Sequence, residues 1–416
     1  MSDHNAARPL VSAIIPTRNR AHLLPRAIDS VLAQEGLGSQ FDLELTVVDD
    51  ASSDATPEVV RRYPTVRYIR LETQRGASAA RNAGIRVSTG RYVAFGDDDD
   101  TWLPSKLRVQ TAALEQHPEV GAVYGQSLVR EDGQDEFLWP DVSNTPSGSV
   151  FRHLLKGCFC IHPSVLLIRR NALDAAGSFD EQLRTHEDYD LWLRIAFHFP
   201  FLFIPGGVAV YHPSPHGLYY SSMANGTGAD DARKVVRKAM QMLPDGRAYD
   251  GIRREMRTRT ELHIALDKMG FAAPEERWRG ALAALRVHPE FLRYHWGRVA
   301  IASEAARLIV RSDSPIATGR ALCEQLRAAT GGRGLNQWLR VRSAIAAVWR
   351  VAAMSLNWDS QKNISASGSA AARAIVYDPS NLRIESLSWF MLRAALSRLR
   401  IRSRRRGRLG GERIPR

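Results

Sequence analysis

Short apolar runs alternate with segments of helical spacing over about the first hundred residues of this 416-residue chain. A short apolar run beside a turn signal is typical of a buried strand, and apolar residues at three- and four-residue spacing indicate a helix. Such alternation is typical of βαβ units. We therefore predict an α/β, Rossmann-like fold with a single, mostly parallel sheet flanked by helices. The predicted strands are 10–15, 43–48, 66–71, 92–95, 120–129 and 165–169, and the predicted helices are 23–33, 56–63, 76–87 and 189–197.

Four consecutive aspartates, residues 97–100, directly follow the predicted strand 92–95. Adjacent carboxylates repel one another, and a divalent cation bound through oxygen relieves that repulsion. Ligands of open α/β sheets bind just outside the carboxyl ends of the strands. The acidic run is therefore a candidate metal site, and a solvated acidic turn is the alternative.

Two more polar clusters follow predicted strands. Residues 16–20 read Pro-Thr-Arg-Asn-Arg after the first strand, and residues 49–54 read Asp-Asp-Ala-Ser-Ser-Asp after the second. Carboxyl ends of parallel strands meet at one edge of the sheet, so we expect all three clusters to converge there. The chain has no G-x-G-x-x-G after its first strand and no G-x-x-x-x-G-K-[ST], which disfavours a dinucleotide-binding or P-loop site.

Five segments resemble conserved motifs of a known family, and they stand in that family's order and spacing. They are VSAIIPTRNR (11–20), LELTVVDDASSDAT (43–56), RGASAARNAG (75–84), GRYVAFGDDDDTWLPSKL (90–107) and SVLLIRRNALDAAGSFDEQLRTHEDYDLWLRIA (164–196). The family is that of the family 2 inverting glycosyltransferases, which have the A-type glycosyltransferase fold. The resemblance covers residues 10–215, about half of the chain.

The resemblance implies donor-binding roles for several residues. Those at the nucleotide are Pro16, Thr17 and Arg18, which follow the first strand. Asp50 would accept a hydrogen bond from a pyrimidine ring N–H. Arg75 and Arg81 flank the start of the third helix, where the family contacts the nucleotide or orders the acidic motif.

The D-x-D signature of the family maps onto Asp97 and Asp99, so the resemblance implies that Mg²⁺ or Mn²⁺ binds there. Asp99 is the first choice as metal ligand, Asp97 is the second, and Asp97 or Asp98 would reach the ribose. His212 is a further candidate for the metal or the diphosphate, with His216 and an ordinary loop histidine as alternatives. His162 and His186 are expected to be structural.

A second acidic pair, Glu187 and Asp188, precedes an amphipathic helix about 90 residues after the metal motif. Transfer to a hydroxyl group needs a base. The resemblance assigns that role to Asp188, while Glu187 would raise the pKa of Asp188 or orient the acceptor. The alternative is that both residues only favour the N-terminal end of a helix dipole.

Positive charge is concentrated in the second half of the chain. Residues 1–225 carry a net charge of −6, and residues 226–416 carry +19. The predicted domains are a catalytic, nucleotide-sugar-binding domain (1–225), a basic helical extension (226–354), a flexible linker (355–383) and a basic amphipathic tail (384–416).

The tail places ten arginines in residues 393–416 and an apolar stripe just upstream, at Trp389, Leu392, Leu396 and Leu399. This pattern predicts docking on an anionic membrane surface. Nucleic-acid binding is not expected, because the tail lacks interleaved aromatic residues, and a disordered solubilising tail is the remaining alternative. No apolar run approaches a membrane span, no signal peptide is apparent, and three cysteines suit a reducing compartment. We expect a cytoplasmic protein, peripheral at the inner face of the cell membrane.

The sequence thus predicts a metal-dependent inverting glycosyltransferase. It would move a sugar from a nucleoside-diphosphate-sugar donor to a saccharide or lipid-linked acceptor, in cell-surface polysaccharide or glycolipid synthesis. A sugar nucleotidyltransferase is the first alternative, although residues 16–20 lack the glycines of its phosphate loop. A non-catalytic nucleotide- or saccharide-binding module is the second, although both acidic motifs are present.

Overall fold

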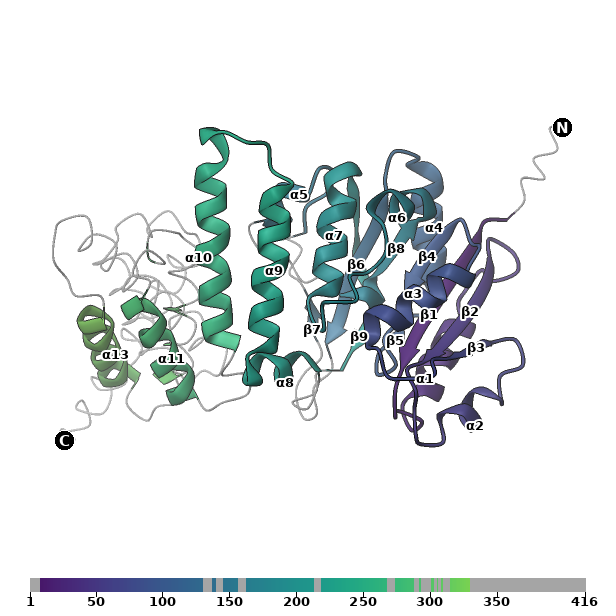
Figure 1. The fold of residues 1–416 in the computed structure, drawn as a ribbon, viewed down its shortest axis with the longest axis horizontal. Helices are drawn as coiled ribbons and strands as arrows, with labels where there is room; N and C mark the ends of the chain where they lie inside the picture. The colour runs from purple at the N-terminus through teal and green to yellow at the C-terminus, as the bar shows by residue number, and fades with distance from the viewer. Residues whose placement is uncertain are drawn as a thin grey trace, which may run out of the picture. The chain divides into compact units, whose positions relative to one another are not determined.

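The computed structural model divides the chain into two compact units, Met1–Arg257 and Thr258–Arg416. The residues that it describes are 8–129, 137–139, 145–155, 162–212, 218–267, 274–287, 292, 301–302, 305, 308–309 and 315–329. Figure 1 shows the sheet in the first unit and helices alone in the described part of the second.

The first part of the sheet is parallel, as the alternation of strands and helices predicts. β1 lies between β2 and β4, β3 pairs with the outer side of β2, and all three pairings are parallel (Figure 1). The strands are β1 (Leu10–Thr17), β2 (Asp42–Asp49), β3 (Arg67–Arg70) and β4 (Tyr92–Phe95), and the connecting helices are α1 (Leu24–Leu32), α2 (Thr56–Val60) and α3 (Ala77–Val87). Each lies within a few residues of its predicted bounds.

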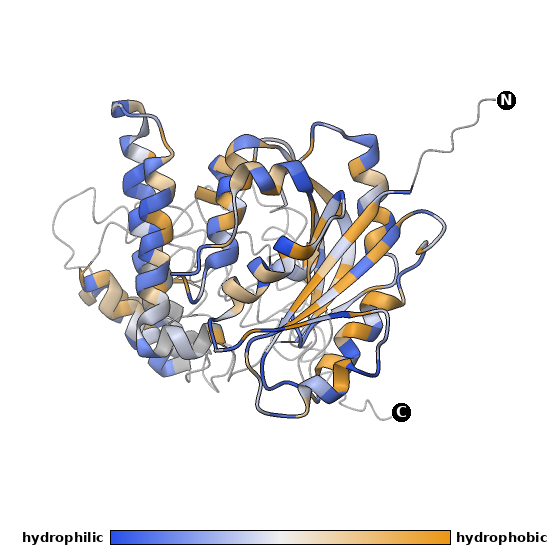
Figure 2. Cartoon of the chain, turned by 45° about the vertical axis from the view of Figure 1, so that its right-hand side comes forward, coloured by the Kyte–Doolittle hydropathy of each residue, from blue (hydrophilic) through white to orange (hydrophobic). Residues whose placement is uncertain are grey.

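The central strands β1 and β4 are largely apolar, as expected for strands that are buried on both faces. All four residues of β4 are buried, as is β1 from Val11 onward. Such continuous apolar runs are typical of covered parallel strands, and these strands are largely orange in Figure 2. α3 packs so closely on β1 that a Cβ added at Gly84 would lie 2.5 Å from Cγ2 of Ile14.

The second part of the sheet is mixed. β8 lies antiparallel between β4 and β6, while β9 runs parallel to β6. Two short strands, β5 and β7, pair antiparallel with β9 and β6. The bounds are β5 (Thr101–Trp102), β6 (Ala122–Val129), β7 (Phe137–Trp139), β8 (Leu166–Arg169) and β9 (Phe201–Tyr211). The predicted α/β class is confirmed, and the antiparallel strands refine the prediction of a mostly parallel sheet.

Helices complete the first unit. They are α4 (Lys106–Gln116), α5 (Phe151–Leu155), the 3₁₀ turn η2 (Pro163–Val165), α6 (Arg170–Ala176), α7 (Glu187–His198), α8 (Leu218–Asn225), α9 (Thr227–Gln241) and the turn η3 (Arg247–Tyr249). The boundary between the two units falls inside α10 (Asp250–Asp267). α9 buries Val235 and Ala239 in the same hydrophobic core as the sheet. The first compact unit runs to Arg257, and the predicted domain bounds stay a prediction.

The described part of the second unit contains α11 (Pro274–Val287) and α13 (Pro315–Ala329). The indole N–H of Trp278 donates a hydrogen bond to Oε1 of Gln325 (2.7 Å), and Leu285 and Leu326 are buried. These helices agree with the predicted helical extension. The predicted linker (355–383) and basic tail (384–416) lie outside the described residues. Within the described ranges, no helix combines the length and apolar character that a membrane crossing requires.

Candidate active site

The polar clusters that follow β1 and β4 meet at the carboxyl edge of the sheet. The hydroxyl group of Thr17, the last residue of β1, donates a hydrogen bond to Oδ2 of Asp98 (2.8 Å). Arg20 forms an ion pair with Asp99 (2.6 Å), and Nη2 of Arg26 donates to the backbone carbonyl of Asp99 (2.6 Å). The convergence expected from the parallel strands is thus present, with the basic residues 20 and 26 facing the acidic run.

Asp50, at the end of β2, is buried and holds the loop that leads into α3. Its carboxylate oxygens accept the backbone N–H groups of Arg75 (2.6 Å) and Gly76 (2.8 Å). Gly76 has φ +93°, a conformation that favours glycine. The Arg75 side chain pairs with Glu181 (2.6 Å). The predicted base-reading residue therefore also fixes the backbone beside it.

The other two residues predicted at the nucleotide lie on the same rim. Pro16 pairs with Val48 inside the sheet, and Arg18 is exposed just beyond β1. The next residue, Asn19, has φ +54° and accepts a hydrogen bond from the backbone N–H of Ser53 (2.7 Å). Asparagine tolerates this left-handed conformation better than most residues. The loops after β1 and β2 are thereby tied together.

Arg81 joins the two acidic motifs. Its guanidinium group, 5% exposed, donates to Oδ1 of Asp97 (2.7 Å) and to Oε1 of Glu187 (2.6 Å). Burial alone would lower the pKa of Arg81, but Asp97 and Glu187 outweigh it and raise that pKa. One buried cation therefore holds the start of α7 against the acidic run. The assignment of Arg81 to the donor or to the acidic motif stays a prediction.

Asp188 lies in the first turn of α7, next to Glu187. Burial, followed by repulsion from Glu187, raises the pKa of Asp188 to about 7, although part of its surface is exposed. The backbone N–H of Tyr189 donates to its Oδ1 (2.6 Å). His186, the residue just before α7, has φ +62°. Strained backbone of this kind occurs often at functional sites. A carboxylate with a pKa near neutrality suits a general base.

The acidic run forms a β-turn, and the turn directs its four carboxylates toward different partners. The backbone N–H of Asp100 donates to the carbonyl of Asp97 (3.2 Å). The two central residues, Asp98 and Asp99, face Thr17 and Arg20. Burial and repulsion from Asp99 raise the pKa of Asp98 to about 7.

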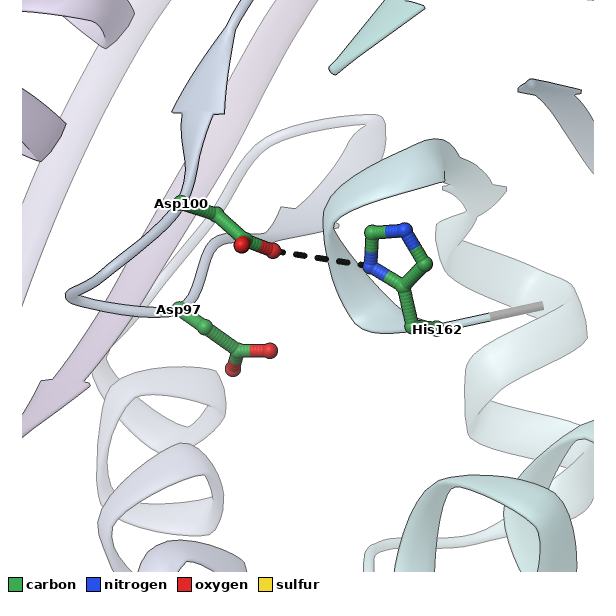
Figure 3. A group of neighbouring side chains, drawn as sticks. All are labelled: Asp97, Asp100 and His162. Atoms are coloured by element: carbon green, nitrogen blue, oxygen red, sulfur yellow. Dashed lines mark ion pairs between the residues drawn. The ribbon is translucent and has the colours of Figure 1, made fainter. Parts of the chain in front are cut away.

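One group of side chains among the described residues has the spacing of a metal site. It consists of Asp97, Asp100 and His162, whose ligand atoms all lie within 4.8 Å of one another (Figure 3). Ser164 of η2 braces the turn: its hydroxyl donates to Oδ2 of Asp100 (2.6 Å) and accepts from the backbone N–H of Asp97 (3.2 Å). Carboxylate and imidazole are both metal ligands in proteins.

The predicted metal ligands are distributed differently. Asp97 belongs to this group, whereas the Asp99 carboxylate pairs with Arg20. The backbone N–H of His212 donates to Asp100, and its side chain is not in the group. His216 lies outside the described residues. Sequence reasoning missed His162 as a ligand, and its only signal is its place just before η2, which leads into the strand β8 beside β4.

Comparison with known proteins identifies the family. The profile described as Glycosyl transferase family 2 matches residues 12–177. The chain is 30% identical over 195 residues to TuaG of Bacillus subtilis, named for teichuronic acid biosynthesis, and the match covers 45% of this chain and 72% of TuaG. The chain therefore belongs to glycosyltransferase family 2, as its motifs predict, and its sheet is that of the A-type glycosyltransferase fold.

Other matches vary in extent. WfaP of Escherichia coli, a UDP-Glc:alpha-D-GlcNAc-diphosphoundecaprenol beta-1,3-glucosyltransferase, is 25% identical over 232 residues, which are 55% of this chain and 84% of WfaP. A mannosyltransferase of Pyrobaculum calidifontis, solved with GDP-Man and Mn²⁺, superposes with a TM-score of 0.49 at 21% identity and covers 85% of this chain and 89% of that chain. The chain spans only 30% of the length of an uncharacterized glycosyltransferase of Rickettsia felis.

Proposed function

We propose that the chain is a metal-dependent, inverting glycosyltransferase that moves a sugar from a nucleoside-diphosphate-sugar donor to an acceptor hydroxyl group. The observation that carries this proposal is the double contact of Arg81. It binds Asp97 of the acidic run and Glu187 beside Asp188, so the two acidic motifs, far apart in sequence, share one buried cation. Membership of family 2 supports the same reaction.

The donor would bind along the rim formed by the ends of β1, β2 and β4. Thr17 and Arg18 would lie at the nucleotide, and Asp50 would read a pyrimidine ring N–H while its oxygens hold the Arg75–Gly76 backbone. Each carboxylate oxygen has two acceptor sites, so the two roles are compatible. Asp98, held by Thr17, would take the ribose.

The acidic run fits a divalent cation. Asp100 is 3% exposed, and its Oδ1 has no hydrogen-bond partner among the described residues. Such an uncompensated buried oxygen is costly unless it binds a proton or a cation. Asp97 and a neighbouring ligand of the acidic run would hold Mg²⁺ or Mn²⁺. When bound, the metal would neutralise the charge that develops on the leaving diphosphate.

Asp188 would act as the general base. It would accept the proton of the acceptor hydroxyl group while that oxygen attacks the anomeric carbon and the bond from this carbon to the diphosphate oxygen breaks. Attack from the face opposite the diphosphate inverts the anomeric configuration. Glu187, held by Arg81, would fix the start of α7 and keep the pKa of Asp188 high. A base is most effective when its pKa lies near the working pH.

The proposal also covers the acceptor of the sugar and the location of the enzyme. The names of TuaG and WfaP refer to teichuronic acid and to a diphosphoundecaprenol-linked sugar. We place the reaction of this chain in polysaccharide or glycolipid synthesis, on a saccharide or lipid-linked acceptor, at the cytoplasmic face of the membrane. The basic tail would hold the enzyme at anionic lipids.

A screen of nucleotide sugars tests the proposal. Each donor is incubated with the full chain and Mn²⁺ or Mg²⁺, and thermal stabilisation and donor hydrolysis are recorded, with EDTA as the metal control. At least one donor should stabilise the chain and release a nucleoside diphosphate only with metal, and Asp188→Asn should bind that donor without hydrolysing it.

The same screen separates the alternatives. Formation of a nucleoside triphosphate from the nucleotide sugar and pyrophosphate would indicate a nucleotidyltransferase. Binding without any turnover in the presence of acceptor saccharides would indicate a binding module. Full turnover in EDTA would remove the metal from the mechanism.

A further inference from the structure

The group formed by Asp97, Asp100 and His162 carries an inference that goes beyond the acidic motif. His162 directly precedes η2, so it reaches the acidic turn from a segment that is distant in sequence (Figure 3). Its Nδ1 lies 3.5 Å from Oδ2 of Asp100. At that distance the two atoms are too far apart for a good hydrogen bond but close enough to share an ion.

Two atoms of this group have no hydrogen-bond partner among the described residues. They are Nδ1 of His162 and Oδ1 of Asp100, and both are buried. Asp100 is the more deeply buried residue, since its side chain is only 2% exposed. Buried polar atoms are nearly always paired, and an exception calls for a ligand, a water or a strained site as its explanation.

A contact on the side away from the carboxylates orients the ring of His162. Its Nε2 contacts the hydroxyl group of Ser127 on β6. A metal-binding histidine commonly uses its second nitrogen for such a contact, which fixes the tautomer and the direction of the ring. With Nε2 bound to Ser127, Nδ1 faces the carboxylates (Figure 3).

Asp99 has a different environment. Its carboxylate binds Arg20 at 2.6 Å, and Arg26 holds its backbone carbonyl. A cation at Asp99 would share this carboxylate with the guanidinium group of Arg20. A cation between Asp97, Asp100 and His162 would take the place of the 3.5 Å contact between Asp100 and His162, and Asp97 would share its charge with Arg81.

We propose that the cation of this enzyme is bound by Asp97, Asp100 and His162, and that the imidazole makes the site selective for Mn²⁺ over Mg²⁺. The proposal rests on the metal-dependent function above and names the ligands. Mg²⁺ prefers oxygen ligands and retains several waters, whereas imidazole binds the transition metals. Three protein ligands leave coordination positions for the diphosphate oxygens of a donor.

Manganese binding to the full chain, without any donor, tests the ligand set. Free Mn²⁺ is measured by its EPR signal during titration, and pulsed EPR of the bound ion detects ¹⁴N from a coordinated imidazole. The wild type should show ¹⁴N coupling, and Mg²⁺ should displace Mn²⁺ only at a tenfold or greater excess. His162→Gln should abolish the coupling and weaken Mn²⁺ binding about tenfold or more.

Two matched variants report on the ligands that the sequence suggests. Asp99→Asn and His212→Gln should each bind Mn²⁺ within about threefold of the wild type and should keep the ¹⁴N coupling. Circular dichroism and thermal unfolding monitor the fold of every variant. If His162→Gln does not fold, the ¹⁴N coupling of the wild type and of His212→Gln still decides the question.

Several results would overturn the proposal. Bound Mn²⁺ without ¹⁴N coupling, or loss of Mn²⁺ binding in Asp99→Asn alone, would place the metal at the D-x-D residues and leave the proposed function intact. Loss of the coupling in His212→Gln alone would make His212 the nitrogen ligand. No Mn²⁺ binding, combined with full turnover in EDTA, would refute metal dependence itself. Asp100 and His162 would then interact through a proton that they share and not through a metal ion.

Discussion

Removing the buried cation at the centre of the site should destabilise the first unit strongly. Arg81→Met keeps the length of the side chain but leaves Glu187 and Asp97 without their partner. Loss of one member of a buried ion pair costs about 3–5 kcal/mol, because the remaining charge is uncompensated. Glu187 is 11% exposed and Asp97 is 29% exposed, so water relieves Asp97 more than Glu187. We therefore expect the lower end of this range, about 3 kcal/mol.

Thermal and urea unfolding of the full chain in EDTA measure this effect. For a unit of this size, 1 kcal/mol corresponds to about 2–4 °C, so the melting temperature should fall by about 6 °C or more. The exposed pair of Arg108 and Glu35 (3.2 Å) provides the control, and Arg108→Met should cost at most about 1 kcal/mol.

A double variant identifies the cause of the loss. Arg81→Met combined with Glu187→Gln removes the more buried of the two uncompensated charges along with the cation. It should be more stable than the sum of the two single losses by about 1 kcal/mol or more. A stability loss in Arg81→Met no larger than that in Arg108→Met would refute the role of Arg81 as a buried partner. Simple addition of the two single losses in the double variant would refute it as well.

Asp188, Gly84 and the basic tail can each be tested separately. Turnover should rise with pH to a plateau above about 7, because Asp188, whose pKa is raised to about 7, must be deprotonated to accept the acceptor proton, and a flat profile from pH 5 to 8 would contradict that role. Gly84→Ala should lose about 1–3 kcal/mol of stability in urea unfolding, since its methyl group meets Ile14 at 2.5 Å, whereas Gly251→Ala, with nothing within 4 Å, should lose none. A chain ending at residue 380 should no longer sediment with anionic liposomes at 0.1 M salt, where the Debye length is about 10 Å, and failure of the full chain to sediment there would refute membrane docking.

Much of the fold is predictable from the sequence because β1 and β4 are short, mostly apolar runs followed by polar residues. β4 is buried on both faces, so its four apolar residues and the polar residues after them mark its end clearly. β5 has only two residues and exists through its pairing with β9, a contact that no local pattern encodes. The antiparallel direction of β8 is likewise set by packing against β4 and β6.

The site shows the same division between local and long-range information. The motifs predict that the acidic run lies at the rim of the sheet, and Thr17 and Asp98 meet there. The turn decides which carboxylate faces which partner. Its hydrogen bond joins Asp100 to Asp97, so the two central residues, Asp98 and Asp99, point away from that pair. His162 could not be predicted as a ligand from the sequence, because it comes close to the acidic run only when β8 lies beside β4.

The anomeric configuration of the product shows whether the reaction is a single displacement. With a donor identified by the screen and a soluble acceptor, proton NMR of the new glycosidic bond reports whether the configuration of the donor sugar is inverted. We predict complete inversion, at a rate that Asp188→Asn reduces by about 10²-fold or more while donor affinity is unchanged. Retention of configuration, or full turnover by Asp188→Asn, would contradict a single displacement with Asp188 as the base.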